Sequence, residues 1–413
     1  MPKFSIIIPT TRAHYLPYSL RSALNQDYDD YEVIVVDNQA EGADAVVREF
    51  ADPKVSCVHT PEKLAMSYNW EFGLRHAKGE YITFLGDDDV FIPQLLSTVA
   101  DAITQYPSVN IFNWKWGSYI YPSFPVPELR NQLTWSDSSD GLYKVESAEV
   151  LRDFYNPVDI YRYSERKRLL PSIFHACCHR QIIETAQEKG GKFFFPSCPD
   201  FSSAFVSLAF SEEEVLIDKP MVIYSSSFDS NGVCMVGERG KIDDFLKEYK
   251  DEIYRTTPLQ TRKVTHNGIA DTMLITQAAF PAELGSFEFG WVSYFNCCYR
   301  EIVILEENGL DMSEDRREFE KVLAGQPDDI RFEVQQWIIN QGSMTTGKQS
   351  RVRRVARYVQ DKFPALRRFR QKMNSMRTSS RSRPAGVIDA REKGLDSIYD
   401  CSVYVGKVIR GQA

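Results

Sequence analysis

The first hundred residues alternate between short apolar runs and segments with helical spacing, and this alternation restricts the fold more than any other feature. The four apolar runs are Phe4–Ile8, Glu32–Val36, Val55–His59 and Tyr81–Leu85. The segments between them with helical spacing are Tyr18–Leu24, Ala43–Phe50 and Lys63–Ala77. Strands that are apolar along their whole length and alternate with helices are typical of a parallel sheet covered on both faces. The sequence therefore predicts an α/β fold.

Polar residues follow three of these strands directly. Pro9-Thr10-Thr11 follow the first strand, Asp37-Asn38 the second, and Asp87–Asp89 the fourth. In a parallel sheet, ligands bind beyond the carboxyl ends of the strands. We therefore expect these three clusters to meet at one edge of the sheet and to form a binding site there.

The acidic triplet Asp87–Asp89 lies in the segment GEYITFLGDDDVFIPQLL, between a strand and a helix that we expect to start near Pro93. Carboxylates are favourable just before a helix, so a solvated helix cap is one interpretation. The other is a divalent cation held by hard oxygen ligands, which also offsets the repulsion between adjacent charges. The convergence of polar clusters at the same edge favours the cation.

Composition limits the alternatives. A chain of 413 residues favours two domains, and 43% hydrophobic residues suit a globular protein. No apolar run is long enough to span a bilayer, and the N-terminus lacks a signal-peptide pattern. The eight cysteines form no C-x-x-C pair, so we expect reduced thiols in a cytosolic protein or one peripheral to a membrane.

Charge is distributed unevenly along the chain. Between Met344 and Pro384 there are thirteen Lys or Arg residues and one acid, a net charge of +12. The whole chain carries −8, so the remainder carries −20. The basic residues alternate with apolar ones at helical spacing, which predicts contact with an anionic membrane surface through residues 348–383. The alternative is a solvated helix that forms salt bridges with the acidic body. No nucleic-acid-binding motif accompanies it.

The motifs FSIIIPT, VIVVDN and GEYITFLGDDD, in this order and spacing, resemble the inverting family 2 glycosyltransferases, which have the GT-A fold, a Rossmann-like, mostly parallel sheet. The resemblance implies a glycosyltransferase domain at residues 1–228. A mainly helical extension at residues 229–343 and a basic amphipathic tail at residues 344–413 follow it by their composition. The implied activity moves a sugar from a nucleoside diphosphate donor, such as a UDP-sugar, to a glycan or lipid-linked hydroxyl.

The resemblance also implies roles for the polar clusters. Asp37 contacts a pyrimidine base, Asp87 and Asp89 hold Mg²⁺ or Mn²⁺, and the cation neutralises the departing diphosphate. The residues expected to bind the nucleotide are Pro9, Thr10, Thr11, Asp37, Lys63, Asp87 and Asp88. A turn cap at Asp37 and a surface lysine at Lys63 are the simpler alternatives.

An inverting transfer also needs a carboxylate that accepts the proton of the acceptor hydroxyl. The family takes it from an acidic pair that opens a helix, and Pro199-Asp200 occupies the matching place before the predicted helix Phe201–Phe210. Only one carboxylate of that pair remains, so Asp200 is the expected general base. A helix-capping role for Asp200, or a base at Asp137 or Asp140, stays open.

Aromatic and basic residues in the middle of the chain are candidates for acceptor binding, since flat ring faces stack on sugars. The residues are Trp116, Tyr119, His175, His179 and Arg180. Core packing is the alternative for the aromatic ones.

Two other functions compete with sugar transfer. A sugar nucleotidyltransferase shares a related sheet, but it carries a glycine-rich phosphate loop after the first strand, and IIIPTTRAHYLPY has no glycine. A GT-A-like scaffold that has lost sugar binding would not need the complete acidic triplet.

Overall fold

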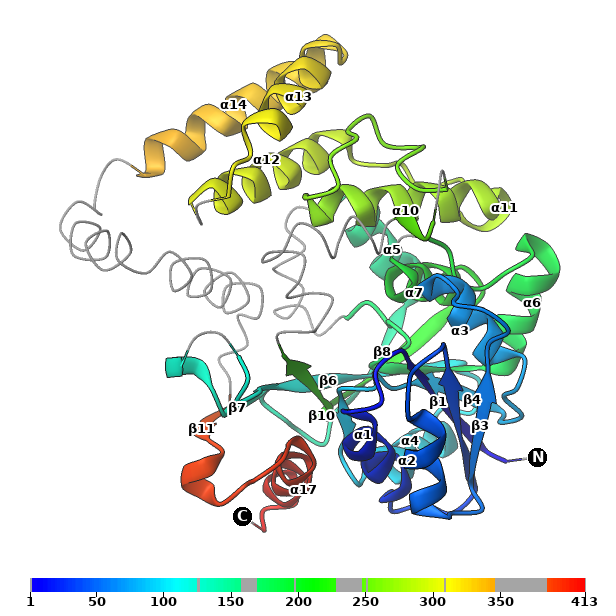
Figure 1. Cartoon of the computed structure of the whole chain (residues 1–413). Coiled ribbons are helices and arrows are strands. Elements are labelled where there is room, and N and C mark those ends of the chain that lie inside the picture. The colour runs from blue at the N-terminus through cyan, green and yellow to red at the C-terminus, as the bar shows by residue number, and fades with distance from the viewer. Residues whose placement is uncertain are drawn as a thin grey trace.

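The computed structural model describes residues 2–124, 127–156, 169–196, 198–227, 247–249, 252–307, 310–345 and 385–412. A central sheet carries helices on both faces, and a group of further helices stands to one side of it (Figure 1). The predicted α/β class is confirmed.

The first four strands form the parallel half of the sheet. They are β1 (Phe4–Thr10), β2 (Tyr31–Asp37), β3 (Val55–His59) and β4 (Tyr81–Phe84), in the order β4-β1-β2-β3. Thr10 is the register partner of Asp37, so the carboxyl ends of β1 and β2 coincide. The predicted strands are therefore present, and their ends share one edge of the sheet.

The second half of the sheet is mixed rather than parallel. Its strands are β5 (Val90–Phe91), β6 (Ile111–Ile120), β7 (Gln132–Trp135), β8 (Leu142–Glu146), β9 (Ala176–His179), β10 (Glu213–Ser226) and β11 (Gly386–Asp389). β10 runs parallel to β6, but β9 is antiparallel to both β4 and β6. The predicted strand pair Val215–Ser227 is instead one strand, β10, whose register shifts around Pro220.

Helices cover the two faces of the sheet. They are α1 (Leu16–Leu24), α2 (Ala43–Phe50), α3 (Met66–Leu74), α4 (Leu95–Gln105), α5 (Ser147–Tyr155), α6 (Arg180–Gly190) and α7 (Pro199–Ala209). Side chains of β1 alternate between the faces: Ile6 and Ile8 pack with α1 and α4, whereas Ile7 packs with α3 and α7. Burial on both faces explains why β1 and β2 are apolar throughout.

The helical extension has its own core. It contains α10 (Thr265–Ala279), α11 (Pro281–Leu284), α12 (Trp291–Glu307), α13 (Ser313–Ala324) and α14 (Asp328–Thr345). Phe295, Ile302 and Phe319 lie at the centre of this core, and α10 connects it to the sheet domain through Met273.

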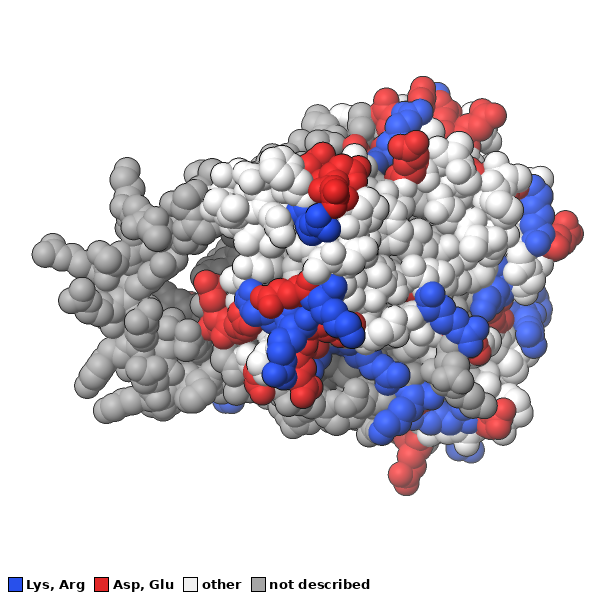
Figure 2. Space-filling view, turned by 90° about the horizontal axis from the view of Figure 1, so that it is seen from above, with Lys and Arg blue, Asp and Glu red and all other residues white. Residues whose placement is uncertain are grey.

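On the face of the molecule seen from above, basic and acidic side chains lie intermingled (Figure 2).

The C-terminal segment differs from the predicted division at residue 344, because it returns to the sheet domain. β11 pairs antiparallel with β7, and α17 (Ile398–Ile409) buries Ile398, Cys401 and Val405 in the core beneath α1 (Figure 1). A Cβ atom at Gly386 would lie 1.9 Å from Cζ2 of Trp135, so only glycine fits there. The predicted amphipathic helix, residues 348–383, lies outside the described residues.

The predicted strand at Lys192–Phe195 is a loop. Its N–H groups are bonded to side chains instead of a neighbouring strand: Glu71 accepts from Phe193 and Phe194, and Ser202 accepts from Phe195 at 2.8 Å. These bonds satisfy the backbone of the loop that leads into α7. Nothing in the local sequence indicated that the Glu71 carboxylate, 122 residues away, would accept the hydrogen bonds that a neighbouring strand was expected to accept.

We expect Glu71→Ala to destabilise the protein by about 3 kcal/mol, because two buried backbone N–H groups would lose their acceptor. Urea unfolding followed by circular dichroism would measure this. Glu71→Gln keeps one acceptor oxygen, so its free energy of unfolding should decrease clearly less than that of Glu71→Ala. An unchanged urea midpoint for Glu71→Ala would contradict the anchoring role of Glu71.

Candidate active site

The acidic triplet occupies the loop between β4 and β5, and its first member is held by the end of β1. Asp87 is buried; its Oδ2 accepts from Thr10 Oγ1 at 2.8 Å and its Oδ1 from Arg12 Nη2 at 2.8 Å. The two loops that were predicted to converge are therefore joined directly by hydrogen bonds. Both oxygens of Asp87 have protein partners, so Asp87 fixes the triplet loop against the end of β1.

Arg12 is a site residue that the sequence analysis missed. Its guanidinium also lies 3.3 Å from Asp88 Oδ2, so it balances part of the triplet's negative charge. Burial alone would lower the pKa of Arg12, but Asp87 and Asp88 outweigh burial and raise it. The position of Arg12, two residues after Thr10 and beyond the strand end, is the signal that could have identified it.

Asp89 lies against the end of β10. Its Oδ1 accepts a 2.7 Å hydrogen bond from the backbone N–H of Ser225. A Cβ atom at Gly86 would come 2.6 Å from Asp89 Oδ2, so glycine leaves room for this carboxylate. Burial and the neighbouring Asp88 raise the pKa of Asp89 well above its usual value.

The carboxylate oxygens of the triplet are ligands that suit a hard divalent cation. Mg²⁺ is usually bound through one or two carboxylates together with substrate phosphates. The triplet offers three neighbouring carboxylates, and a cation beside them would offset the repulsion from Asp88 that adds to burial in raising the pKa of Asp89. Asp87 and Asp89 are the predicted ligands, and Asp88 lies between them in the same loop.

The end of β2 carries a second polar cluster. Asp37 is largely buried; its Oδ1 accepts from the N–H of Ala40 at 2.6 Å and its Oδ2 lies 3.0 Å from His59 Nδ1. Asn38 donates to the carbonyl of Leu64 at 2.8 Å. These bonds fix the loops around the position where the family resemblance expects a base.

Asp200 stands in the first turn of α7, directly after Pro199. Burial raises the pKa of its carboxylate to about 6, although the N–H of Phe201 acts in the opposite direction. A carboxylate with this pKa is largely ionised at neutral pH and can still accept a proton, as a general base must.

Three rings cluster near the end of β10, next to the Ser225 N–H that binds Asp89. His175 donates from Nε2 to the carbonyl of Leu170 at 2.8 Å, so its Nδ1 accepts from the Tyr224 hydroxyl at 2.7 Å. Trp116 packs against His175 with ring centroids 5.0 Å apart. Burial lowers the pKa of His175 to about 4, which keeps the ring neutral.

Asp89 and Asp200 both affect the pKa of Tyr224. Burial raises its pKa well above the usual value, and repulsion from Asp89 and from Asp200 adds to the shift. Sequence reasoning identified Trp116 and His175 but missed Tyr224, which is one residue before the Ser225 N–H that binds Asp89.

The remaining predicted residues fall into three groups. Pro9 and Thr11 lie at the end of β1, beside Thr10, as expected. Lys63 is mostly exposed and pairs with Glu248 at 2.7 Å. Of the alternative bases, Asp140 is exposed and pairs with Lys219 at 2.6 Å.

Three predicted acceptor residues lie away from the site. Tyr119 is buried in the core with Tyr121, because its position on β6 faces α1 and α17. His179 is the register partner of Tyr81, the first residue of β4, and Arg180 donates to the carbonyl of Gly79 at 2.7 and 2.9 Å. Both therefore lie at the opposite edge of the sheet, where they hold the start of β4.

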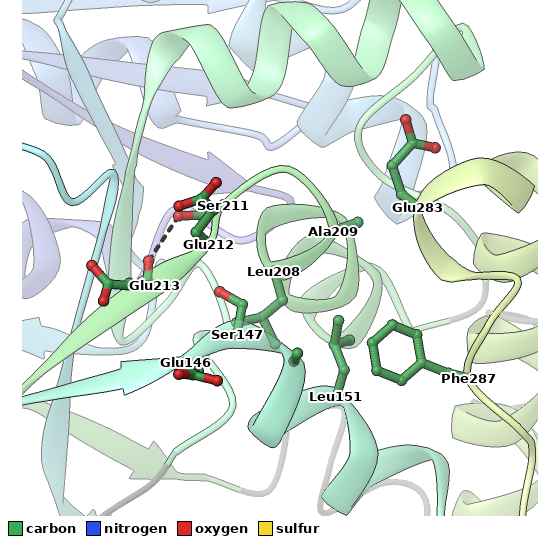
Figure 3. A pocket seen from close by; sticks show the side chains of 11 residues that line it. Glu146, Ser147, Leu151, Leu208, Ala209, Ser211, Glu212, Glu213, Glu283 and Phe287 are labelled. Atoms are coloured by element: carbon green, nitrogen blue, oxygen red, sulfur yellow. Dashed lines mark hydrogen bonds between the residues drawn. The ribbon is translucent and has the colours of Figure 1, made fainter.

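A separate cavity of about 400 Å³ opens at the other end of β10 (Figure 3). It is bordered by Glu212 and Glu213 at the start of the strand, with Leu208 and Phe287 among its apolar residues. Lys144 pairs with Glu213 at 2.6 Å and offsets part of the charge. Because Ser225 lies at the far end of the same strand, this cavity is distinct from the candidate active site.

The N-terminal region is similar to known glycosyltransferases. The model of the glycosyl transferase family 2 matches residues 5–170. Over 104 residues, 24% of this chain, the sequence is 36% identical to GalNAc(5)-diNAcBac-PP-undecaprenol beta-1,3-glucosyltransferase of Campylobacter jejuni. It is 32% identical over 100 residues, 23% of this chain, to the putative colanic acid biosynthesis glycosyl transferase WcaA of Escherichia coli. The matches span 34% and 36% of these relatives, about a third of their length.

Among solved structures, the chain is similar to S. aureus TarS 1–349 in complex with UDP-GlcNAc. The TM-score is 0.46 with 16% identity, covering 82% of this chain and 92% of that one. In the part of the chain that the structure describes, no helix is long and apolar enough to cross a membrane.

Proposed function

We propose that the chain, whose residues 5–170 match the model of glycosyl transferase family 2, transfers a sugar from a nucleoside diphosphate donor to a hydroxyl of a glycan or lipid-linked acceptor. A UDP-sugar is the proposed donor, with Thr10, Asp37 and Asp88 on its nucleotide side. The observation that carries the proposal is the meeting of the acidic triplet with the ends of β1 and β10: Thr10 and Arg12 donate to Asp87, and the Ser225 N–H donates to Asp89.

In the proposed reaction, Asp200 accepts the proton of the acceptor hydroxyl while that oxygen bonds to the anomeric carbon. The bond between this carbon and the diphosphate breaks, and its electron pair leaves with the diphosphate, so the configuration inverts. Asp87 and Asp89 would hold Mg²⁺ or Mn²⁺, which supplies Lewis-acid stabilisation of the leaving phosphate. Arg12 lies beside the same carboxylates and holds Asp87 and Asp88 in place.

The aromatic cluster is the proposed acceptor side. Trp116, His175 and Tyr224 are each partly exposed, and repulsion from Asp200 contributes to the raised pKa of Tyr224. Because Tyr224 donates to His175, its hydroxyl oxygen keeps lone pairs for a sugar hydroxyl. The rings would stack on the acceptor and present one hydroxyl to Asp200.

Calorimetric titration of UDP-sugars, with and without MnCl₂, tests the function. We expect binding that depends on the metal and slow hydrolysis of one donor. A protein that binds no nucleotide sugar under either condition would be a scaffold. One that consumes a nucleoside triphosphate and a sugar phosphate would be a nucleotidyltransferase. Either result would refute the proposed transfer.

We further propose that residues 348–383, which lie outside the described residues, contact the anionic inner face of a membrane. The Campylobacter relative is named for a PP-undecaprenol-linked glycan, and an acceptor of that kind is held in a membrane. A cytoplasmic protein bound peripherally to the membrane would meet it there.

Replacing Arg351, Arg353, Arg354 and Arg357 by glutamine is expected to weaken binding to phosphatidylglycerol vesicles by roughly 10²–10³-fold, since each basic residue near such a surface contributes about 1 kcal/mol. Flotation of the full chain with vesicles measures this, with phosphatidylcholine vesicles as the control. Substitution is preferable to truncation, because β11 and α17 follow this segment. Equal binding of variant and parent would contradict the assignment.

A further inference from the structure

Three side chains of different chemistry meet beside the edge strand β3. Cys57 and His59 are two residues apart on this strand and therefore face the same side of the sheet. Asp44 reaches them from the first turn of α2. One ligand atom of each lies within 4.8 Å of the others, and within the described residues this is the only such group of three.

The imidazole of His59 is fixed on both sides. Its Nδ1 lies 3.0 Å from Asp37 Oδ2 and its Nε2 lies 3.2 Å from Asp44 Oδ1. If Nδ1 carries the proton and donates to Asp37, Nε2 has a lone pair that faces the Asp44 carboxylate. Two acceptors so close need a positive charge between them, either a second proton or a metal ion.

The arrangement has the features of a metal site with a formed outer shell. Histidine ligands usually donate their other ring N–H to a carboxylate, as His59 does to Asp37. Asp37 is held in turn by the N–H of Ala40 at 2.6 Å. Ligands about 2.0 Å from a tetrahedral Zn²⁺ are separated by roughly 3.3 Å, close to the 3.2 Å between His59 and Asp44.

We propose that Asp44, Cys57 and His59 bind a zinc ion, with Asp37 as the outer-shell partner of His59. A thiolate, an imidazole and a carboxylate form a ligand set that suits Zn²⁺ rather than Mg²⁺, which prefers oxygen alone. The side chains of Asp44 and His59 are 53% and 49% exposed, so an ion can enter from solvent and water can occupy the fourth position. On binding, zinc replaces the proton of the Cys57 thiol, which passes to solvent, and no oxidation occurs.

This site is separate from the pair Asp87 and Asp89, and it does not depend on the proposed function. Asp37 lies between the two regions: it contacts His59 through its side chain, and Thr10 of the active-site edge is its register partner. An ion at His59 would therefore restrict the movement of Asp37.

Calorimetric titration of the metal-free full chain with ZnCl₂ tests the proposal. We expect one zinc ion per chain, and binding at least 100-fold weaker in both Cys57→Ser and His59→Gln. Cys297→Ser, a partly buried cysteine on α12, is the matched control and should bind normally. Asp37→Asn should weaken binding by about 10–100-fold, as expected for an outer-shell residue. Asp89→Ala should leave zinc binding unchanged, which separates this site from the donor site.

Absorption of the Co²⁺-loaded chain gives a second readout. A thiolate-to-cobalt band should be present in the parent chain and absent in Cys57→Ser. Asp44→Asn, at an exposed position, should weaken Co²⁺ binding. Thermal unfolding of each variant without metal shows whether it is folded. Zinc binding that is equal in the parent, Cys57→Ser and His59→Gln, or no zinc binding by the parent, would overturn the proposal.

Discussion

Asp200→Asn is expected to lower the rate of sugar transfer by about 10²–10⁴-fold while donor affinity stays the same, because the variant cannot accept the proton of the acceptor hydroxyl. Asparagine has nearly the shape of aspartate, so α7 and its contacts should persist. Initial rates with saturating donor and calorimetric donor binding, measured on the same preparation, separate the two effects.

Asp140→Asn is the matched control, since Asp140 is an exposed acid that was an alternative base and pairs only with Lys219 among the described residues. Its transfer rate should match that of the parent chain. If Asp200→Asn retains full turnover, the proton is accepted elsewhere and the assignment of Asp200 is wrong.

The pKa of Asp200 also predicts two pH effects with opposite consequences. The base is active when ionised, so the transfer rate should rise as pH increases through about 6. The stability of the fold, in contrast, should decrease as pH rises. The pKa in the folded state, about 6, exceeds the ordinary value of 3.8, so the folded state binds more protons in this range and the free energy of unfolding falls as pH rises. Asparagine does not ionise, so Asp200→Asn avoids this decrease in the free energy of unfolding. The variant should be more stable than the parent at pH 8 by about 1–3 kcal/mol.

The second large effect is expected for Asp89→Ala, which should weaken Mn²⁺-dependent donor binding by on the order of 100-fold or more, because a carboxylate ligand and its charge are lost. The raised pKa of Asp89 implies that this binding strengthens with increasing pH, since the cation requires the ionised carboxylate. Titrations of UDP-sugar with MnCl₂ at pH 6 and pH 8 would measure both.

Asp101→Ala, an exposed acid on α4, is the control and should bind donor normally. Asp89→Ala should also lose the bond from the Ser225 N–H, so its thermal stability without ligands must be compared with that of the parent. Unchanged metal-dependent donor binding in Asp89→Ala would contradict the assignment of the acidic triplet to the donor site.

The parallel half of the fold and its polar edge were predictable from the sequence for a physical reason. Strands buried on both faces are apolar throughout, and a parallel arrangement places all their carboxyl ends at one edge. The position of Thr10, Asp37 and Asp87 at that edge follows from these two facts, and the structure brings them together.

The failures concern contacts between residues that are distant in sequence. Arg12 is drawn to the triplet by charge, 75 residues away, and the loop before α7 is held by Glu71. Tyr119 and Tyr121 are two residues apart and lie on the same face by alternation, and both are buried in the core that α17 completes on its return from the C-terminus. Periodicity describes which face of a strand a residue occupies, but not what covers that face.

The pairing of β7 with β11 has a consequence for biosynthesis. About 250 residues separate the two strands, and a ribosome adding 5–20 residues per second needs roughly 12–50 s to make them. During that interval β7 is an unprotected sheet edge, and the apolar side chains that later pack against α17 are exposed. Newly made chains should therefore be most prone to aggregation late in translation, and a chaperone that shields strand edges would improve the yield.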